Sequence, residues 1–415
     1  MQLRRAVITG LGVVSPAGND LDTFFGSLLA GKSFLRDIDR FDASRYPAHS
    51  AGLVDGLDPD GKFSKRLVKK LDRFSHMALV ATDSALNDAK LKLDKEDKER
   101  IGIIIGNALG GWEFAETELR DLYEGGLRDV SPYQATAWFP AAPQGQVSIH
   151  YGITGFAKTI ISDIASSLLA LGYAARAIAT GKADVVIAGG TEAPVSPYAL
   201  LCCNSSGEMS ENGNYRPFDK HRDGYVVGEG AAILIVESLE RAEARGARIY
   251  AEITGFGHTS DGVDPKYPDP EGKGLARAMR RALSASGIEA GEVGCLMPAG
   301  LGGKVFDSSE ARALRDVYGD GLNSGLAIGI PKALYGNLLG ASGAMDAVVA
   351  CLSMDRGVMP TSTGCTEPED GCGWVNGKNK TAVKRIEYSM INSVGRGGVN
   401  ASLVLAKRQG GSTCP

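Results

Sequence analysis

The sequence predicts an α/β fold made of two similar halves. Short apolar runs with glycines close by alternate with longer apolar segments that contain no proline. The short runs are typical of buried strands in a sheet covered on both faces, and the longer segments are typical of helices. A seven-residue pattern also occurs twice, as AVITGLG at Ala6–Gly12 and as AEITGFG at Ala251–Gly257. This repeat indicates two copies of one α/β unit.

The individual elements follow from the same pattern. Helices are expected at Phe74–Ala89 and Ala165–Ile178, and a charged helix at Glu237–Arg245 closes the first half. Residues 258–275, rich in Asp, Gly and Pro, are expected to form a surface loop. Strands are expected at Ala6–Thr9, Ile101–Ile105, Val185–Ala188, Ala231–Val236, Ala251–Thr254 and Ala401–Leu405. The halves are then residues 1–250 and 251–408, and residues 409–415 are expected to be a disordered tail.

Composition excludes several classes of protein. The chain has 415 residues, 55 of them glycine, with 43% hydrophobic residues and a formal net charge of −4. It is too apolar for a disordered chain, shows no collagen period, and has no dense basic run, so no nucleic-acid partner is expected. No apolar stretch approaches the roughly 20 residues of a membrane span, so no membrane partner is expected either. Seven irregularly spaced cysteines are typical of reduced thiols in the cytoplasm.

The segment from Ile161 to Arg176 is the strongest candidate for a site. Ser162 or Asp163 can cap a helix that is apolar nearly all round and therefore buried. The free N–H groups and dipole at the start of such a helix stabilise an anion. A cysteine in that first turn would have a lowered pKa and would be nucleophilic.

Three stretches resemble the β-ketoacyl synthases of the thiolase fold: Ala183–Glu192, Arg216–Ala231 and Leu338–Ala344. The resemblance covers about residues 1–408. It implies two pseudo-repeated halves in a five-layer α-β-α-β-α arrangement. Acidic residues within the family-like strings are expected to tie loops together by hydrogen bonds. These residues are Asp219, Asp223, Glu229, Asp307, Glu310 and Asp346.

The resemblance also identifies the positions that carry catalysis in active relatives. Ile164 stands at the position of the nucleophilic cysteine, and Ala299 and Asn337 stand at the positions of two histidines. Lys332 alone remains of the usual catalytic set. Isoleucine and alanine offer no acid, base or nucleophile. We therefore expect a catalytically inactive subunit with no condensing activity of its own, no cofactor and no metal.

Further strings resemble the chain length factors of type II polyketide synthases, also called ketosynthase β subunits: Asn107–Phe114, Ala137–Phe139 and Gly145–Ile149. Arg396 stands where active enzymes usually carry a gatekeeper phenylalanine. This likeness implies a heterodimer with an active ketosynthase α subunit, and an acyl carrier protein as second partner. The subunit would set polyketide chain length in an aromatic pathway by completing the acyl tunnel.

The chain-length gate of that subfamily falls on Trp112, Ala115 and Leu119, whose spacing places them on one helical face. Three alternatives stay open. The three residues can be ordinary dimer core in a purely structural partner. Ile164, in place of the usual glutamine, also leaves room for a reducing, polyene-type system. A stand-alone condensing enzyme with unorthodox residues is the third reading.

Two other signals have simple structural interpretations. Gly10-Leu11-Gly12 lacks the third glycine of a dinucleotide loop and is expected to be a turn. A basic cluster on one helix is either a docking patch for an acidic carrier protein or a solvated helix face. Its members are Lys62, Lys65, Arg66, Lys69, Lys70 and Arg73.

Overall fold

The computed structural model describes residues 3–57, 61–323, 326–360, 364–375, 380–382 and 386–408. The tail at 409–415, expected to be disordered, lies outside the described residues. No described helix is both long and apolar enough to cross a membrane.

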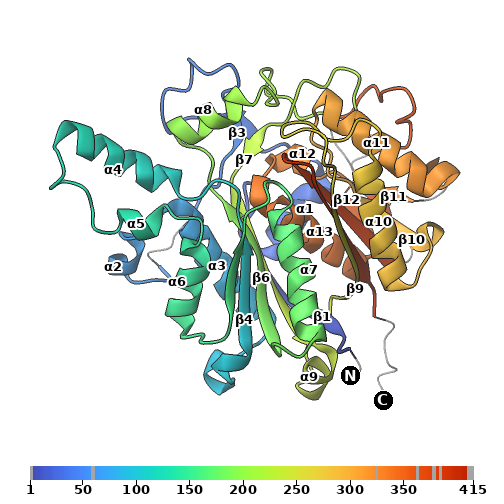
Figure 1. The fold of residues 1–415 in the computed structure, drawn as a ribbon, viewed down its shortest axis with the longest axis horizontal. Coiled ribbons are helices and arrows are strands. Elements are labelled where there is room, and N and C mark those ends of the chain that lie inside the picture. The colour runs from blue at the N-terminus through green and yellow to red at the C-terminus, as the bar shows by residue number, and fades with distance from the viewer. Residues whose placement is uncertain are drawn as a thin grey trace.

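Ten of the described strands form the main sheet, in the order β11-β10-β14-β15-β9-β1-β8-β6-β4-β5, and the other five form two small sheets. Five strands come from each half of the chain, and the halves meet where β1 pairs antiparallel with β9. Figure 1 shows the two sets of strands side by side, with helices between and outside them. The first five strands are β1 (Ala6–Val14), β4 (Ile101–Gly106), β5 (Ala157–Ile160), β6 (Val185–Glu192) and β8 (Gly230–Ser238). The second five are β9 (Ala251–Ser260), β10 (Val293–Met297), β11 (Ala327–Ile328), β14 (Tyr388–Gly395) and β15 (Val399–Ala406).

Helices complete the expected five layers. α3 and α6 cover the outer face of the first set of strands, α7 and α13 lie between the two sets, and α10 and α11 cover the outer face of the second. α7 packs against β4 and β6 on one side and against β9 and β15 on the other, so its residues are nearly all buried. These helices are α3 (Arg73–Asp88), α6 (Ala142–Tyr151), α7 (Ser166–Ala179), α10 (Lys273–Ser286), α11 (Lys304–Tyr318) and α13 (Ser342–Arg356). The thiolase-type α/β arrangement is confirmed, while the division at residue 250 stays a prediction.

The repeated glycines lie inside strands, so the predicted turn at Gly10-Leu11-Gly12 is wrong. A Cβ at Gly12 would lie 2.0 Å from the carbonyl oxygen of Ala81 in α3. A Cβ at Gly257 would lie 2.1 Å from the carbonyl oxygen of Ala278 in α10. The same close strand-to-helix contact therefore occurs in both halves, and this contact is the physical reason for the repeat.

The six predicted strands are all present, mostly longer than expected, and two boundaries differ. Glu237 belongs to β8, not to the charged helix, which is reduced to α9 (Leu239–Ala244). The buried carboxylate of Glu237 is held by Arg241 and Arg245. The predicted loop at 258–275 is shorter, because β9 continues to Ser260 and α10 starts at Lys273.

α4 (Trp112–Glu124) projects from the body of the molecule, followed by the short α5 (Gln134–Ala137) (Figure 1). Large apolar side chains are exposed on this arm and beside it; we call them the α4 apolar surface. They are Tyr123, Leu127, Tyr133, Trp138, Phe139 and Ile149. Exposed apolar patches of this kind mark interaction sites.

The remaining described helices and strands are short or peripheral. They are α1 (Leu21–Ala30), α2 (Lys65–Val68), α8 (Pro197–Ser205), α12 (Lys332–Tyr335), β2 (Leu35–Asp37), β3 (Ser50–Gly52), β7 (Val227–Gly228), β12 (Val358–Pro360) and β13 (Lys380–Ala382).

Candidate functional site

Ile164 lies just before α7, with its side chain buried at the start of the helix. The predicted cap by Ser162 or Asp163 is wrong, because the N-cap residue is Ala165 and no side chain caps the helix. Instead, the Ser166 hydroxyl donates to the carbonyl of Asp163 at 2.6 Å and accepts from the amide of Ser162 at 2.8 Å. The turn is thus held from inside the helix, and Ile164 is fixed in place.

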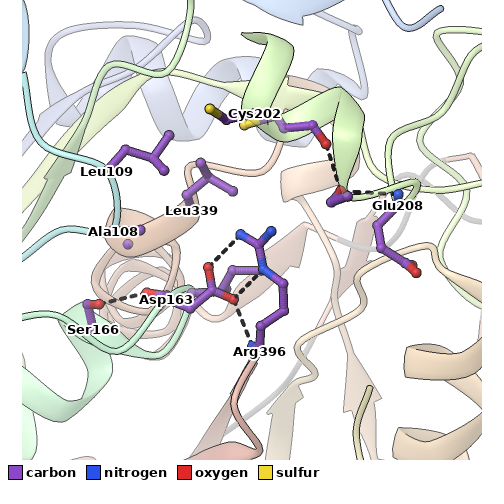
Figure 2. A network of polar contacts seen from close by, with 12 residues as sticks. Ala108, Leu109, Asp163, Ser166, Cys202, Glu208, Leu339 and Arg396 are labelled. Atoms are coloured by element: carbon purple, nitrogen blue, oxygen red, sulfur yellow. Dashed lines mark hydrogen bonds and ion pairs between the residues drawn. The ribbon is translucent and has the colours of Figure 1, made fainter. Parts of the chain in front are cut away.

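An ion pair covers this turn. The Arg396 guanidinium contacts both carboxylate oxygens of Asp163, at 2.9 and 3.2 Å, and the Arg396 amide donates to the same carboxylate at 2.8 Å. Figure 2 shows the guanidinium lying against the Asp163 carboxylate from the neighbouring loop. These hydrogen bonds raise the pKa of Arg396. Asp163 also has a positive φ of 50°, an uncommon conformation for a residue with a side chain.

A closed pocket lies under the Asp163–Arg396 pair. Ile164, Tyr225 and Phe306 also line it, and its volume is about 10 Å³. This is about the space that one water molecule needs. The buried Tyr225 hydroxyl has no hydrogen-bond partner among the described atoms.

Ala299 lies in a loop that buried acids hold by its backbone. Glu310 accepts from the amides of Ala299 and Gly300, both at 2.8 Å. Lys332 donates to the carbonyl of Ala299 at 2.9 Å and to Asp346 at 2.6 Å. Burial raises the pKa of both Glu310 and Asp346. The expectation that these acids tie loops together is confirmed.

Asn337 is fully buried, and one of its polar atoms has no partner. Its Oδ1 accepts from the amide of Leu339 at 2.9 Å and from the hydroxyl of Ser342 at 2.8 Å. Its Nδ2 donates to no described atom. Glu192 supports the same loop, accepting from the amides of Ala108 and Gly340, and burial raises the pKa of Glu192 to about 8. Asn337 thus keeps one unused hydrogen-bond donor in the core.

The three predicted gate residues do not share one environment. Trp112 and Leu119 line an open groove of about 560 Å³ between α4 and α8, where the Trp112 ring lies 4.6 Å from that of Tyr198. Ala115 is buried at 3% exposure and does not line the groove. The helical spacing predicts that the three residues share one side of α4. In the structure Trp112 and Leu119 face the groove, whereas Ala115 is buried in the protein.

The basic cluster does not lie on one helix either. α2 has only four residues, Lys65–Val68, and Arg73 opens α3. The Arg73 guanidinium turns inward and binds the buried carboxylate of Glu229, with Nε 2.9 Å from Oε2. Of the remaining members, Lys62, Lys65, Arg66 and Lys69 are exposed, and Lys62 is paired with Asp83 at 3.1 Å.

Position 164 offers no side-chain nucleophile, because it is an isoleucine. The described part of the chain also contains no group of three His, Cys, Asp or Glu side chains placed to hold a metal. Sequence reasoning missed the Asp163–Arg396 pair and the free Asn337 donor. The sequence contained a signal for this pair, because Arg396 replaces an apolar gatekeeper and the acidic Asp163 stands directly before Ile164.

Comparisons with known families match almost the whole chain. Residues 3–242 match the β-ketoacyl synthase N-terminal domain and residues 250–366 match the C-terminal domain. A 3-oxoacyl-(acyl-carrier-protein) synthase 2 of Staphylococcus aureus is 38% identical over 98% of this chain and 99% of its own. The protein of the same name from Coxiella burnetii is 36% identical over equal shares.

Solved structures give the same result. The ishigamide ketosynthase/chain length factor has a TM-score of 0.92 and 29% identity, over 98% of this chain and all of that one. AntDE:AntF, a type II polyketide synthase acyl carrier protein in complex with its ketosynthase, has a TM-score of 0.89 and 27% identity over the same shares. These likenesses do not single out the chain length factors.

The expectation of a catalytically inactive, chain-length-setting subunit without condensing activity is contradicted. The relatives that match at 36–38% identity along nearly their full length are named as 3-oxoacyl-(acyl-carrier-protein) synthases. The expectation rested on three side chains, whereas the match to these relatives extends over 98% of this chain. The chain belongs to the β-ketoacyl synthase family.

Proposed function

We propose that the protein serves the 3-oxoacyl-(acyl-carrier-protein) synthase reaction, with the acyl chain bound beside Ile164 and not bonded to it. The observation that carries the proposal is the buried framework around an apolar position 164. Glu310 and Lys332 bind backbone groups of the Ala299 loop, and Asp346 pairs with Lys332, although the loop has no histidine. Removing the several charged groups of this framework from water costs free energy. We take this cost as a reason to expect that the site still binds a ligand.

The reaction joins an acyl group to a malonyl thioester. The C–S bond of the acyl donor breaks as its carbonyl carbon bonds to C2 of the malonyl unit and CO₂ leaves. The released thiolate takes up a proton from water to become a thiol. The chain contributes hydrogen bonds and positioning. The unused Nδ2 of Asn337 is the donor that we assign to a thioester carbonyl oxygen. Arg396 moves away from Asp163 to admit the acyl chain.

The groove at Trp112 and Leu119 is our proposed site for the distal part of the acyl chain. Its volume of about 560 Å³ and aromatic wall suit an apolar chain. Ala115 is buried behind the groove, and in this proposal it does not contact the acyl chain.

Two partners follow from the same proposal. The exposed cations Lys65, Arg66 and Lys69 suit an acidic acyl carrier protein, and a carrier protein is present in the AntDE:AntF complex. The α4 apolar surface suits a second chain of the ketosynthase family, since large apolar side chains such as Tyr123 and Leu127 are more than four-fifths exposed.

The test uses the protein as isolated, with any ketosynthase-family chain that co-purifies. Hexanoyl carrier protein and malonyl carrier protein are added, and products are followed by mass spectrometry. We expect 3-oxooctanoyl carrier protein to form only when the protein is present, with no acyl adduct on it. Ile164→Cys is the matched variant, and there we expect an added hexanoyl mass on the protein.

Two results would overturn the proposal. One is no more 3-oxooctanoyl carrier protein with the protein than without it, because then the protein has no part in the condensation. The other is a hexanoyl adduct on the unaltered chain, because then the acyl group is held covalently elsewhere.

A further inference from the structure

One carboxylate links the two walls of the groove between α4 and α8. α4 supplies Trp112 and Glu116 to the groove, and α8 supplies Tyr198. The Oε1 atom of Glu116 accepts from the backbone amide of Tyr198 at 2.9 Å and from that of Ala199 at 3.4 Å. A single side chain of one wall therefore binds the backbone of the other.

α8 depends on this contact for its N-terminal cap. Its N-cap residue, Ser196, forms no side-chain cap, and Pro197 in the first position has no N–H group. The next two amides, of Tyr198 and Ala199, have no acceptor within a helix. Glu116 binds both of them and also accepts from the Ser196 hydroxyl. Its negative charge suits the positive end of the helix dipole, so Glu116 takes the place of the missing cap.

α4 is itself fixed at its start. It projects from the body of the molecule (Figure 1), and its N-cap residue, Gly111, offers no side-chain cap. The buried carboxylate of Asp72 accepts from the amide of Phe114 in α4 at 2.8 Å and from the amide of Phe74 in α3 at 3.0 Å. The first turn of α4 is thus tied to the body of the protein. Glu116, two residues after Phe114, joins α8 to this fixed turn.

The contact lies next to the place where the two walls meet. The rings of Trp112 and Tyr198 are 4.6 Å apart, which leaves no room for an acyl chain between them. Trp112 is four residues before Glu116 and shares its side of α4. Tyr198 carries one of the two amides that Glu116 binds. The position of α8 under Glu116 therefore determines whether the two rings close the groove.

We propose that Glu116 is a positioning residue that sets the length of the acyl chain accepted by the groove. The proposal rests on the proposed function, in which the groove holds the distal part of the acyl chain. While Glu116 holds α8, Trp112 and Tyr198 stay in contact and limit the space. Without this carboxylate the start of α8 is released, the rings separate, and a longer chain fits. Glu116 acts through α8 and has no contact with the reacting atoms.

The first measurement needs no substrate. Hydrogen exchange with mass spectrometry, on the protein as isolated with any chain that co-purifies, follows the peptide that contains Tyr198 and Ala199. In Glu116→Ala these two amides should exchange roughly tenfold faster, because they lose a hydrogen bond to a charged group. Glu116→Gln keeps an acceptor oxygen and should retain most of the protection. Glu124→Ala is the matched control, since Glu124 is an exposed acid at the other end of α4.

The second measurement compares two chain lengths. Hexanoyl and dodecanoyl carrier proteins are titrated into each variant, and the ratio of their dissociation constants is taken. Glu116→Ala should shift this ratio roughly tenfold in favour of dodecanoyl. Glu116→Gln and Glu124→Ala should stay close to the unaltered protein. A purely structural role would weaken both titrations by the same factor, and circular dichroism with melting temperature verifies that each variant folds.

Two results would overturn the proposal. One is unchanged exchange of the Tyr198 and Ala199 amides in Glu116→Ala, because then the carboxylate does not hold α8. The other is faster exchange with an unchanged ratio, because then the position of α8 does not select chain length. Either result alongside normal condensation by the unaltered protein refutes the role of Glu116 alone. Absence of condensation refutes the proposed function instead, and amide exchange still reports whether Glu116 holds α8.

Discussion

Replacing Lys332 by methionine tests the buried framework of the site. The Lys332 and Asp346 side chains are 3% and 1% exposed, and their charged atoms are 2.6 Å apart. Lys332→Met keeps the length of the side chain but leaves Asp346 buried without a counter-charge, and it removes the donor to the carbonyl of Ala299. Removing one partner of a buried pair costs about 3–5 kcal/mol of unfolding free energy. We expect a loss of this size at pH 7.5.

The loss should depend on pH. Burial raises the pKa of Asp346 in the folded protein, and Lys332 opposes that rise. Without Lys332 the folded-state pKa rises further above its unfolded value, so the penalty is full above that pKa and disappears as Asp346 takes up a proton. The deficit of Lys332→Met should therefore shrink as the pH falls toward 5.

Equilibrium urea unfolding at fixed protein concentration, at pH 7.5 and 5.5, measures both effects. The double variant Lys332→Met/Asp346→Leu is the control, because two apolar residues of similar size leave no orphan charge. It should recover most of the loss. A single-variant loss below about 1 kcal/mol, or a double variant as unstable as the single one, would refute the reasoning.

Three further predictions concern other parts of the fold. Gly12→Ala and Gly257→Ala should each lower unfolding stability by about 1–3 kcal/mol in urea titrations, because each Cβ overlaps a helix carbonyl, whereas Gly26→Ala, with open space around it, should not. Two arginines lower the pKa of Asp184 to about 2, so its ion pairs stabilise the fold above pH 4 and are lost as the pH falls through 2; acid titration of Asp184→Asn should lack this component. Arg396→Ala should open the acyl pocket and increase affinity for long-chain acyl carrier protein over short-chain, measured by titration; unchanged chain-length preference would argue against the gate.

The fold could be predicted from the sequence because the pattern of apolar residues and the repeated sequence strings indicate which segments are buried. The runs at Ile101–Ile105 and Ala231–Val236 became central strands, since continuous apolar residues suit a sheet covered on both faces. The glycine repeat was recognised, but its cause was not. A close approach between a strand and a helix 70 residues away leaves no local signal at Gly12.

The site was predicted only in part. Ile164, Ala299, Lys332 and Asn337 were located by their strings, and the structure shows Ile164 at the α7 start and Lys332 beside the Ala299 carbonyl. The missing parts depend on contacts between distant segments, such as Arg396 with an acid 233 residues earlier. The inactive-subunit hypothesis was wrong because it relied on the side chains at three positions, whereas the similarity to 3-oxoacyl-(acyl-carrier-protein) synthases extends over nearly the whole chain.

The central position of β1 has a consequence for how the chain is made. β1 is synthesised well before both of its neighbours, because β8 and β9 come more than 200 residues later in the chain. At about 5–20 residues per second, Ala6–Val14 waits roughly 10–50 s for a hydrogen-bonding partner. During that time a strand that is apolar except for Thr9 has two unpaired edges, which is a template for aggregation. Nascent chains of this protein should therefore depend on a chaperone until about residue 260 has emerged, and a fragment that ends before β9 should aggregate.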